Sequence, residues 1–389
     1  MSKEWLFVAL SLLYAPFRGS AKTLQQPLER VVIVQMAKLG DMVCTTPMFR
    51  AIKEKYPACE VIVVGNKINR DLLEGNVNVD QYMAFDGIWN TIRALRRSQI
   101  DFGCITSPSA PLLAVLYLSG VRMIAAPLVE GGRSPNETVA YRLLARLCVT
   151  RPHRMHHYAP GEYLKLLEPI AIHTENTKKY LSHTREARTR TDAFLQEHSF
   201  GAQGRLLLGV APSAGHKTKE WFPDRFAEVI TALHAEYPID VVLIGSAGDM
   251  ETAEAVKEHL SLPVVDTCGM FGLDDAKALI ASLDLLLSVD TGPVYVAEAF
   301  GVPTVDITGP IDEREQPPID DIHLVVTPAG KREPQLFVMN AREYDLAKVK
   351  QQLNSITSEM VLVACRTLIE RIQTCRGQGT SHTPAPDPL

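Results

Sequence analysis

The sequence predicts an α/β protein of two successive domains, each a parallel sheet covered by helices. Short β-branched runs such as VVIVQ at 31–35 alternate with longer segments whose apolar residues follow helical spacing. The alternation breaks off in a polar, charged stretch at 176–204 and then starts again. A chain of 389 residues is also long enough for two domains. Repeated β–α units of this kind indicate two Rossmann-like domains with a cleft between them.

The first domain is expected over 31–190. VVIVQ is typical of a buried strand, and the segment after it, DMVCTTPMFRAIKEKY, places apolar residues at helical spacing. The basic segment WNTIRALRRSQ is interpreted as a helix that leads into the next strand. In chain order, the expected strands and helices lie at 31–35, 41–56, 60–64, 89–99, 100–106, 111–119 and 121–125.

The second domain is expected over 205–350, after a connection and a surface helix within 176–204. Its strands and helices are expected at 205–210, 223–236, 241–245, 274–282, 283–289, 293–300 and 303–307. Beyond residue 356 the segment MVLVACRTLIERI has helical spacing. The tail at 377–389 is rich in Pro, Gly, Ser and Thr and is expected to be disordered.

The composition excludes several classes of protein. The chain is 46% hydrophobic and 22% charged, which excludes a fibrous or largely disordered protein. Its net charge of −5 provides no global basic field, so nucleic acid is not expected as a partner. The seven Cys are scattered singly without a CxxC pair. This pattern argues against a disulfide framework or a structural zinc site and favours the reducing cytoplasm.

The N-terminal segment, 1–30, is open to three interpretations. Its apolar run WLFVALSLLYAP at 5–16 is too short to span a bilayer, which needs about 20 residues. It can lie on a membrane surface as an interfacial helix, pack on its own domain, or be a cleaved signal peptide. The interfacial interpretation assigns the lipid-facing positive charge to Lys3, Arg18, Lys22 and Arg30.

A first candidate site follows the first strand, in the sequence KLGD at 38–41. Ligands of open α/β sheets bind beyond the carboxyl ends of the strands, and Gly40 allows a ligand to approach the backbone. Asp41 at a helix start is either an N-cap or a general base that faces the cleft. The sequence is not a GxGxxG fingerprint, which disfavours a nicotinamide-dependent enzyme.

Two further candidates follow strands of the second domain. In SVDTGP at 288–293, Asp290 can accept hydrogen bonds from ligand hydroxyls, and Thr291 and Gly292 open a helix whose amides can bind phosphate. The loop APSAGHKTKEWFP at 211–223 contains Ser213, His216, Lys217, Thr218 and Lys219, of which the lysines are suited to phosphate. No second ligand stands at metal spacing from His216, so no metal site is expected.

Basic residues elsewhere in the first domain are candidates for binding an anionic acceptor. The stretch RPHRMHH at 151–157 contains Arg154 and His157, and the expected helix at 89–99 contains Arg93. Lys38 stands beside the KLGD turn. The plain alternative for each is a solvated surface charge.

Taken together, the segments GDMVCTTPMFRAIKEKYP, KTKEWFPDRFAEV and SVDTGPVYVAEAFGVPTVDITGPIDE resemble glycosyltransferase family 9, the ADP-heptose:lipopolysaccharide heptosyltransferases. The resemblance runs from about residue 31 to about residue 364. It implies the GT-B fold, two facing Rossmann-like domains with a C-terminal helix, expected at 351–376, that crosses back to the first domain.

The resemblance also implies roles for single residues. Asp41 matches the proposed general base for the acceptor hydroxyl, and Lys219 matches the lysine that stabilises the leaving diphosphate. Asp290 matches the aspartate that holds the donor sugar, and Thr291 and Gly292 match the turn that faces phosphate. Gly40, Ser213 and Thr218 complete the expected donor site. No metal or other cofactor is implied.

This sequence departs from the family pattern in the donor half. Tyr295 stands where members usually have His, and Glu298 stands where a small residue is common. The residues before the lysine, at 214–218, also differ from the usual set. These departures bear on the donor sugar or nucleotide rather than on the fold.

The expected function is inverting, metal-independent transfer of a heptose or related sugar to a lipopolysaccharide-type acceptor. The expected donor is a nucleotide-diphosphate sugar, and the resemblance implies ADP-heptose. An inverting transfer needs one base and stabilisation of the departing diphosphate, and Asp41 and Lys219 are suited to these tasks. The expected partners are a nucleotide sugar, an anionic glycolipid and the cytoplasmic face of the inner membrane. The alternative is a GT-B-like protein that binds sugar nucleotides or glycans without catalysis.

Overall fold

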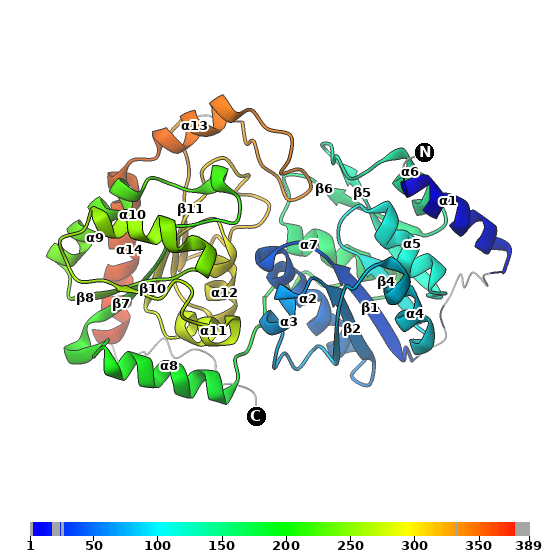
Figure 1. The fold of residues 1–389 in the computed structure, drawn as a ribbon, viewed down its shortest axis with the longest axis horizontal. Helices are drawn as coiled ribbons and strands as arrows, with labels where there is room; N and C mark the ends of the chain where they lie inside the picture. Colours follow the sequence, from blue (N-terminus) through cyan, green and yellow to red (C-terminus); the bar gives the residue numbers. More distant parts are fainter. Residues whose placement is uncertain (1–2, 18–23, 25–26, 331–332, 378–389) are drawn as a thin grey trace. The chain divides into compact units, whose positions relative to one another are not determined.

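The computed structural model describes residues 3–17, 24, 27–330 and 333–377 and divides the chain into two compact units (Figure 1). The first unit contains the chain up to Tyr180 together with Phe337–Glu343. The second contains Leu181–Leu336 and the chain from Tyr344 onward. Arg18 and Lys22 and the expected disordered tail at 378–389 lie outside the described residues.

The first unit contains a parallel six-stranded sheet in the order β3-β2-β1-β4-β5-β6. In chain order its strands are β1 (Arg30–Gln35), β2 (Glu60–Gly65), β3 (Gln81–Ala84), β4 (Phe102–Ile105), β5 (Met123–Glu130) and β6 (Val149–Arg154). The central strand β1 is buried from Val31 to Gln35 because helices cover both faces of the sheet. This burial explains the continuous apolar run of VVIVQ.

The helices of the first unit follow its strands in the β–α alternation that the sequence predicts. They are α1 (Lys3–Tyr14), η1 (Ala15–Phe17), α2 (Leu39–Lys55), α3 (Ile68–Leu72), α4 (Ile88–Ser98), α5 (Ala110–Leu118), α6 (Val139–Ala145), α7 (Ala159–Leu164) and η2 (Lys165–Ile170). Helix α1 packs on α5 and α6, with Phe7 and Val8 buried in their core cluster. One face of the N-terminal segment is therefore packed on its own domain.

The second unit repeats the same architecture, with the strand order β12-β11-β10-β7-β8-β9. Its strands are β7 (Leu206–Ala211), β8 (Ile239–Leu243), β9 (Val265–Asp266), β10 (Leu285–Val289), β11 (Thr304–Ile307) and β12 (His323–Val326). Its helices are α8 (Arg185–Glu197), η3 (Ala202–Gly204), η4 (Lys217–Lys219), α9 (Pro223–Glu236), η5 (Ala247–Asp249), α10 (Met250–Glu258), α11 (Leu273–Ala281), α12 (Gly292–Phe300), α13 (Leu346–Ser355) and α14 (Ser358–Gly377).

Both sheets have the doubly wound strand order of Rossmann folds, and this confirms the predicted fold class. In each sheet the chain runs outward from its first strand, returns, and then runs outward to the other side. The point of reversal lies between β1 and β4 in the first unit and between β7 and β10 in the second. Ligands of such sheets bind outside the carboxyl ends of the strands at this point.

Each strand and helix expected from the sequence has an observed counterpart, and the strands that the sequence did not predict are β3, β6, β9 and β12. These four are the edge strands of the two sheets. An edge strand is not buried on all sides, so it needs no continuous apolar run; β6, for example, contains Pro152 and two arginines. The unit boundary, after Tyr180, lies upstream of the expected 190 because α8 packs on α11 of the second unit.

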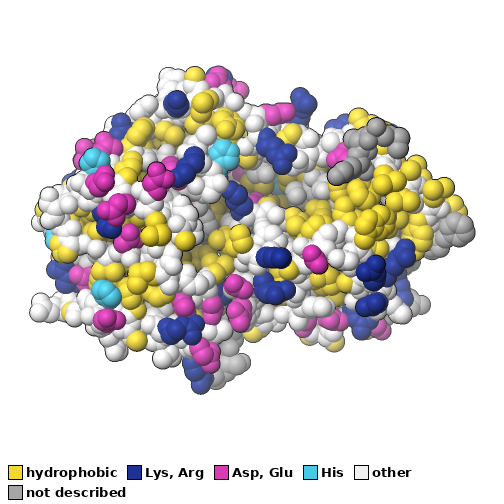
Figure 2. Space-filling view, in the orientation of Figure 1, with side chains coloured by type: hydrophobic (Ala, Val, Ile, Leu, Met, Phe, Trp, Pro, Cys, Tyr) yellow, Lys and Arg dark blue, Asp and Glu magenta, His cyan; other side chains and the backbone are white. Residues whose placement is uncertain are grey.

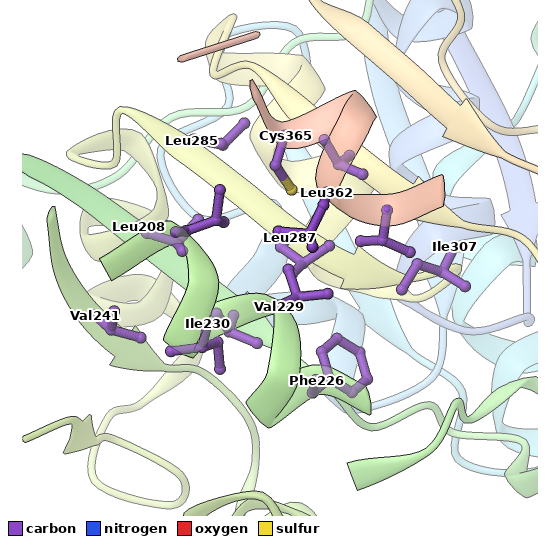
Figure 3. Close-up of a cluster of buried hydrophobic side chains, with 14 of the residues drawn as sticks. Leu208, Phe226, Val229, Ile230, Val241, Leu285, Leu287, Ile307, Leu362 and Cys365 are labelled. Atoms are coloured by element: carbon purple, nitrogen blue, oxygen red, sulfur yellow. The ribbon is translucent and has the colours of Figure 1, made fainter. Parts of the chain in front are cut away.

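The C-terminal helix α14 belongs to the core of the second unit, which differs from the expectation that 351–376 returns to the first domain. It packs on α9 and along β10, β11 and β12. Figure 3 shows Leu362 and Cys365 of this helix beside Leu287, Phe226 and Val229. Apolar residues at helical spacing along α14 face this core. The later segment that groups with the first unit is Phe337–Glu343.

Among the described residues, no helix is both long enough and apolar enough to cross a membrane.

Packing of α14 on the second sheet predicts a large difference between two positions of that helix. Ile369→Ala should lower the free energy of unfolding by about 2–5 kcal/mol, because Ile369 is 1% exposed and its removal leaves a cavity. Val363→Ala, on the exposed face of the same helix, should change it by no more than about 0.5 kcal/mol. Urea unfolding of both variants measures the difference. Equal effects would contradict the packing of α14 described here.

Candidate functional site

One candidate site, in the first unit, is the turn after β1, which polar side chains hold in place. Gln35, the last residue of β1, accepts a hydrogen bond from the Ala37 amide at 3.0 Å and donates to Thr45 Oγ1 at 3.1 Å. Asn66 and Asn69 both donate to the Ala37 carbonyl, at 2.8 and 3.0 Å. The backbone of this turn is therefore fixed from two sides before any ligand binds.

Asp41 lies in the first turn of α2, not at its N-cap. The N-cap is Lys38, which makes no side-chain capping hydrogen bond and is exposed. A carboxylate in the first turn is favoured by the partial positive charge of the helix N-terminus. Asp41 is only half-buried, and its backbone carbonyl accepts a hydrogen bond from Thr45 Oγ1 at 2.7 Å. The capping interpretation of Asp41 is thus wrong.

A second candidate site, in the second unit, is a buried carboxylate with two donors. Asp290, directly after β10, is 2% exposed. Its Oδ2 forms an ion pair with the ammonium group of Lys219, and its Oδ1 accepts a hydrogen bond from the Tyr295 hydroxyl. Lys219 comes from the loop after β7, so the strands on either side of the reversal each contribute one partner.

Tyr295 therefore has a structural role in this second candidate site. It lies on α12 and is 2% exposed. With Lys219 on one oxygen and Tyr295 on the other, the Asp290 carboxylate is held in one orientation. The residue at which the sequence departs from the family pattern is thus one that fixes Asp290.

The loop after β7 directs its two lysines differently. Lys217 is exposed and pairs with Glu220 at 3.0 Å, whereas Lys219 reaches Asp290. Thr218 Oγ1 lies 2.6 Å from His216 Nδ1, so both side chains are occupied within the loop. Of the two lysines, Lys219 is thus the one that pairs with Asp290, and Thr218 is directed to His216.

Trp221, in the same loop, is buried in the core of the second unit and holds the loop in place. It is 3% exposed, packs edge-on against Phe226, and donates from Nε1 to the Ile356 carbonyl at 3.2 Å. This contact explains why the lysine is followed so closely by a tryptophan. A buried indole two residues after Lys219 limits how far that lysine can move.

The start of α12 is the third component. Thr291 is the N-cap in an extended conformation and makes no side-chain capping hydrogen bond, and Gly292 and Pro293 form the first turn. The first turn of a helix presents backbone N–H groups without acceptors in the helix, together with the positive end of its dipole. Such a terminus beside Lys219 and Asp290 is suited to a phosphate group.

Two buried polar groups near this site are without hydrogen-bond partners among the described residues. The first is the Ser213 hydroxyl, in the loop after β7. The second is the Asp306 carboxyl group, of which neither oxygen has a partner. Asp306 lies on β11, paired in register with Ser288 of β10, and is fully buried. Burial raises the pKa of Asp306 well above its ordinary value, and the nearby Asp290 charge raises it further while Lys219 lowers it. Asp306 is therefore a carboxyl group held in its neutral form.

The candidate acceptor residues do not gather at one place. Arg154 and His157 lie at and after the carboxyl end of β6, and both are exposed. Between them and the core, His153 is 2% exposed, and burial lowers its pKa to about 4, so it is neutral and structural. Arg93 lies on α4 and lines a groove with α1 instead of standing beside Asp41.

Sequence patterns alone missed Gln35, Asn66, Asn69 and Asp306. Asp306 had a detectable signal, because an acidic residue inside the apolar run PTVDI is unusual for a buried strand. The asparagines had none, because they support the β1 turn from a different β–α connection.

Two successive Rossmann-type sheets, each with a charged loop at its point of reversal, are the architecture of the GT-B fold. The sequence model of glycosyltransferase family 9 (heptosyltransferase) matches residues 123–345, more than half of the chain. The chain therefore belongs to glycosyltransferase family 9 and is a glycosyltransferase. The matched segment includes Lys219, Asp290 and Tyr295, and Asp41 lies before it.

Individual relatives are similar over most of the chain. Lipopolysaccharide heptosyltransferase 3 of Escherichia coli K12 is 23% identical over 368 residues, which cover 85% of this chain and 95% of that protein. A family 9 glycosyltransferase from Veillonella parvula has a TM-score of 0.74 at 20% identity, covering 90% of this chain and 99% of that one. The E. coli ADP-heptose lipopolysaccharide heptosyltransferase II structure has a TM-score of 0.68 at 20% identity, covering 88% and 99%. These structural similarities support the fold.

The neutral state of Asp306 predicts how stability depends on pH. Its folded pKa is raised, so the folded protein binds a proton more tightly than the unfolded chain. The associated stability is complete below the unfolded pKa of about 4 and is lost as the pH rises toward the folded pKa. Asp306→Asn keeps the shape and removes the titration. The melting temperature of this variant relative to the natural protein should therefore rise as the pH increases above the unfolded pKa.

Thermal unfolding monitored across that pH range measures the difference. Asp290→Asn serves as the comparison, because it removes a carboxylate that is already paired with Lys219 and Tyr295. A melting-temperature difference between Asp306→Asn and the natural protein that stays constant, or reverses with pH, would show that Asp306 is ionised in the folded state.

Proposed function

We propose that this protein is an inverting, metal-independent heptosyltransferase that uses an ADP-heptose-type donor and a lipopolysaccharide core or related glycan as acceptor. The observation that carries the proposal is the Lys219–Asp290 pair beside the start of α12, at the reversal point of the second sheet. The first sheet offers Asp41 after its own central strand. The two sets of residues supply the two functions that an inverting transfer requires.

The donor half is suited to a nucleoside diphosphate. Lys219 and the α12 amides provide positive potential for the two phosphates, and their contribution grows as negative charge develops on the leaving group. Asp290 is held by Tyr295 on its other oxygen, so it keeps a donor when Lys219 turns toward phosphate. A carboxylate fixed in this way can accept hydrogen bonds from the sugar hydroxyls. Lys219 and the helix terminus take the place that a divalent cation has in other transferases.

The acceptor half is suited to deprotonation of a hydroxyl. In the reaction the acceptor oxygen forms a bond to the anomeric carbon while the bond from that carbon to the diphosphate oxygen breaks. Asp41 takes the hydroxyl proton, and the electron pair leaves with the nucleoside diphosphate. Attack from the face opposite the leaving group inverts the configuration at the anomeric carbon.

The identity of donor and acceptor rests on the relatives. The E. coli heptosyltransferase II is an ADP-heptose lipopolysaccharide heptosyltransferase, and the E. coli K12 relative is a lipopolysaccharide heptosyltransferase. We transfer these chemical classes to this chain, with Tyr295 as the position where its donor selectivity differs. A glycolipid acceptor places the reaction at the cytoplasmic face of the inner membrane, where nucleotide sugars are available.

A sugar-binding protein without catalysis is the alternative, and the arrangement of residues argues against it. Such a protein would need the phosphate-facing helix and Asp290, but it would have no use for a carboxylate at the turn after β1. Asp41 is held there by a turn that Gln35, Asn66 and Asn69 fix. The alternative therefore predicts donor binding without turnover.

Asp41→Asn should lower turnover by about 10²–10⁴-fold, the usual contribution of a general base. The amide keeps the size of the carboxylate but does not accept the proton. Donor affinity should be nearly unchanged, because Asp41 acts on the acceptor. Donor titration calorimetry and a transfer assay with a lipopolysaccharide core acceptor measure the two effects. Loss of donor binding with retained turnover at saturating donor would refute the role of Asp41.

Lys219→Ala should weaken binding of the nucleoside diphosphate and slow transfer, because its charge faces the leaving group in both ground and transition states. Lys217→Ala is the matched control: it lies two residues away in the same loop, and its charge is directed to Glu220. Only the first variant should lose affinity in calorimetry with ADP.

A chelator should leave the rate of transfer unchanged if Lys219 and the α12 amides stabilise the diphosphate. Turnover of the natural protein is compared before and after treatment with EDTA. Loss of activity that magnesium restores would contradict the metal-independent mechanism and leave the assignment of Asp41 untouched.

A further inference from the structure

Helix α1 is apolar on two opposite faces, which is unusual for a helix at a protein surface. Its inner face contributes Phe7 and Val8 to the core cluster over α5 and α6. Its outer face carries large apolar side chains that the described residues leave exposed, of which Leu12 is 55% and Leu13 is 69% exposed. The inner face is explained by packing, and the outer face requires another apolar environment.

Helix α4 extends this apolar surface and adds positive charge to it. Trp89 of α4 is 56% exposed, and its ring lies 6.5 Å from that of Phe7 in α1. Arg93, Arg96 and Arg97 follow on the same helix, and all three are exposed. Figure 2 shows hydrophobic side chains gathered over α1 and Lys and Arg side chains over α4.

A groove of about 770 Å³ lies between the two helices. Its apolar lining includes Leu10, Leu13 and Trp89, and its charged lining consists of the three arginines of α4. Among the described residues that line it, none is acidic. The acidic residue of α1, Glu4, accepts a hydrogen bond from Thr138 Oγ1 of the α6 N-cap at 2.9 Å instead.

One arginine is fixed in place at the groove. Arg96 donates from Nε to the Leu118 carbonyl at 2.8 Å, and its guanidinium lies 5.5 Å from the centre of the Tyr14 ring. A guanidinium stacked on an aromatic ring keeps donors available for an anion while its other face is desolvated. The groove thus combines ordered positive charge with an apolar surface.

We infer that the outer face of α1, together with Trp89 and the arginines of α4, is a docking surface for a bilayer that contains anionic phospholipid. The leucines of α1 enter the apolar boundary of the bilayer, Trp89 lies at the headgroup level, and the arginines bind lipid phosphates. With 12 residues, α1 extends about 18 Å, so it lies in the membrane surface and does not cross it. This surface would add a membrane contact to the proposed acceptor site. Its role in catalysis on a glycolipid therefore rests on the proposed function.

The positive charge of this surface comes from residues other than Arg30, one of those expected from the sequence. Arg30, expected to face lipid, instead donates to Glu60 at 2.8 Å and to the Ser98 carbonyl at 3.1 Å. Arginines of α4, some eighty residues away from α1 in sequence, take its place. A second copy of this chain is a poorer occupant than lipid, because a two-fold contact would set the arginine clusters of two copies against one another.

Two variants of the full chain test the surface. Leu12→Ser combined with Leu13→Ser should weaken partitioning into vesicles of phosphatidylethanolamine and phosphatidylglycerol at least about tenfold, because two side chains lose their apolar burial. Arg97→Gln should weaken it about fivefold, the usual contribution of one basic residue near an anionic surface. The natural protein should bind vesicles of phosphatidylcholine alone much more weakly, and added salt should reduce its binding to the anionic vesicles.

Matched controls are available in the second unit. Val363→Ser and Lys350→Gln change an exposed apolar and an exposed basic residue on α14 and α13, and neither should alter vesicle binding. Melting temperatures of all variants check that they fold. Equal vesicle binding by the natural protein and both surface variants would overturn the inference, as would a dimer in solution that the leucine variant abolishes.

A transfer assay with a core acceptor freed of its lipid separates this inference from the proposed function. The leucine variant should retain turnover with that acceptor and lose it on acceptor embedded in vesicles. Vesicle binding without any transfer by the natural protein would overturn the proposed function and leave the docking surface intact. Transfer without vesicle binding would overturn the docking surface and leave the proposed function intact.

Discussion

The direction of the parallel strands is the constraint on which both candidate sites depend. In both sheets the chain begins at the centre, winds to one side, and returns to wind to the other. At the reversal two neighbouring strands send their following loops in opposite directions, so a space is left at their carboxyl ends. Asp41 follows one such strand, and Lys219 and Asp290 follow the two strands of the other reversal. The strand order therefore fixes where these three residues lie in each sheet, whatever their side chains are.

Electrostatics then determines which side chains can remain at those positions. Asp290 is almost fully buried, and a buried carboxylate is tolerated only with partners. Lys219 and Tyr295 provide them, one on each oxygen. Asp306, one strand away, has no such partners among the described residues, and its pKa rises so that it stays neutral. The two carboxyl groups thus differ in their surroundings, because Asp290 has two hydrogen-bond partners and Asp306 has none among the described residues.

The strands that the sequence predicts are the interior ones, and the reason is burial. The four central strands of each sheet are covered on both faces, so they need apolar runs such as VVIVQ or LLLSV that can be recognised locally. The edge strands β3, β6, β9 and β12 are short or mixed in character and give no such signal. Their places are decided by hydrogen bonding to a neighbour that lies far away in the sequence.

The sequence by itself determined the fold class, the two-domain division and the family, because these depend on local patterns: apolar runs, strand-to-helix turns and short motifs. Tertiary structure alone decided which lysine of the KTK loop reaches Asp290, that Tyr295 holds its other oxygen, that α14 packs on the second sheet, and that α4 supplies the positive charge beside α1. Each of these pairs residues distant along the chain, and such pairs follow from packing and charge compensation across elements, which no local pattern contains.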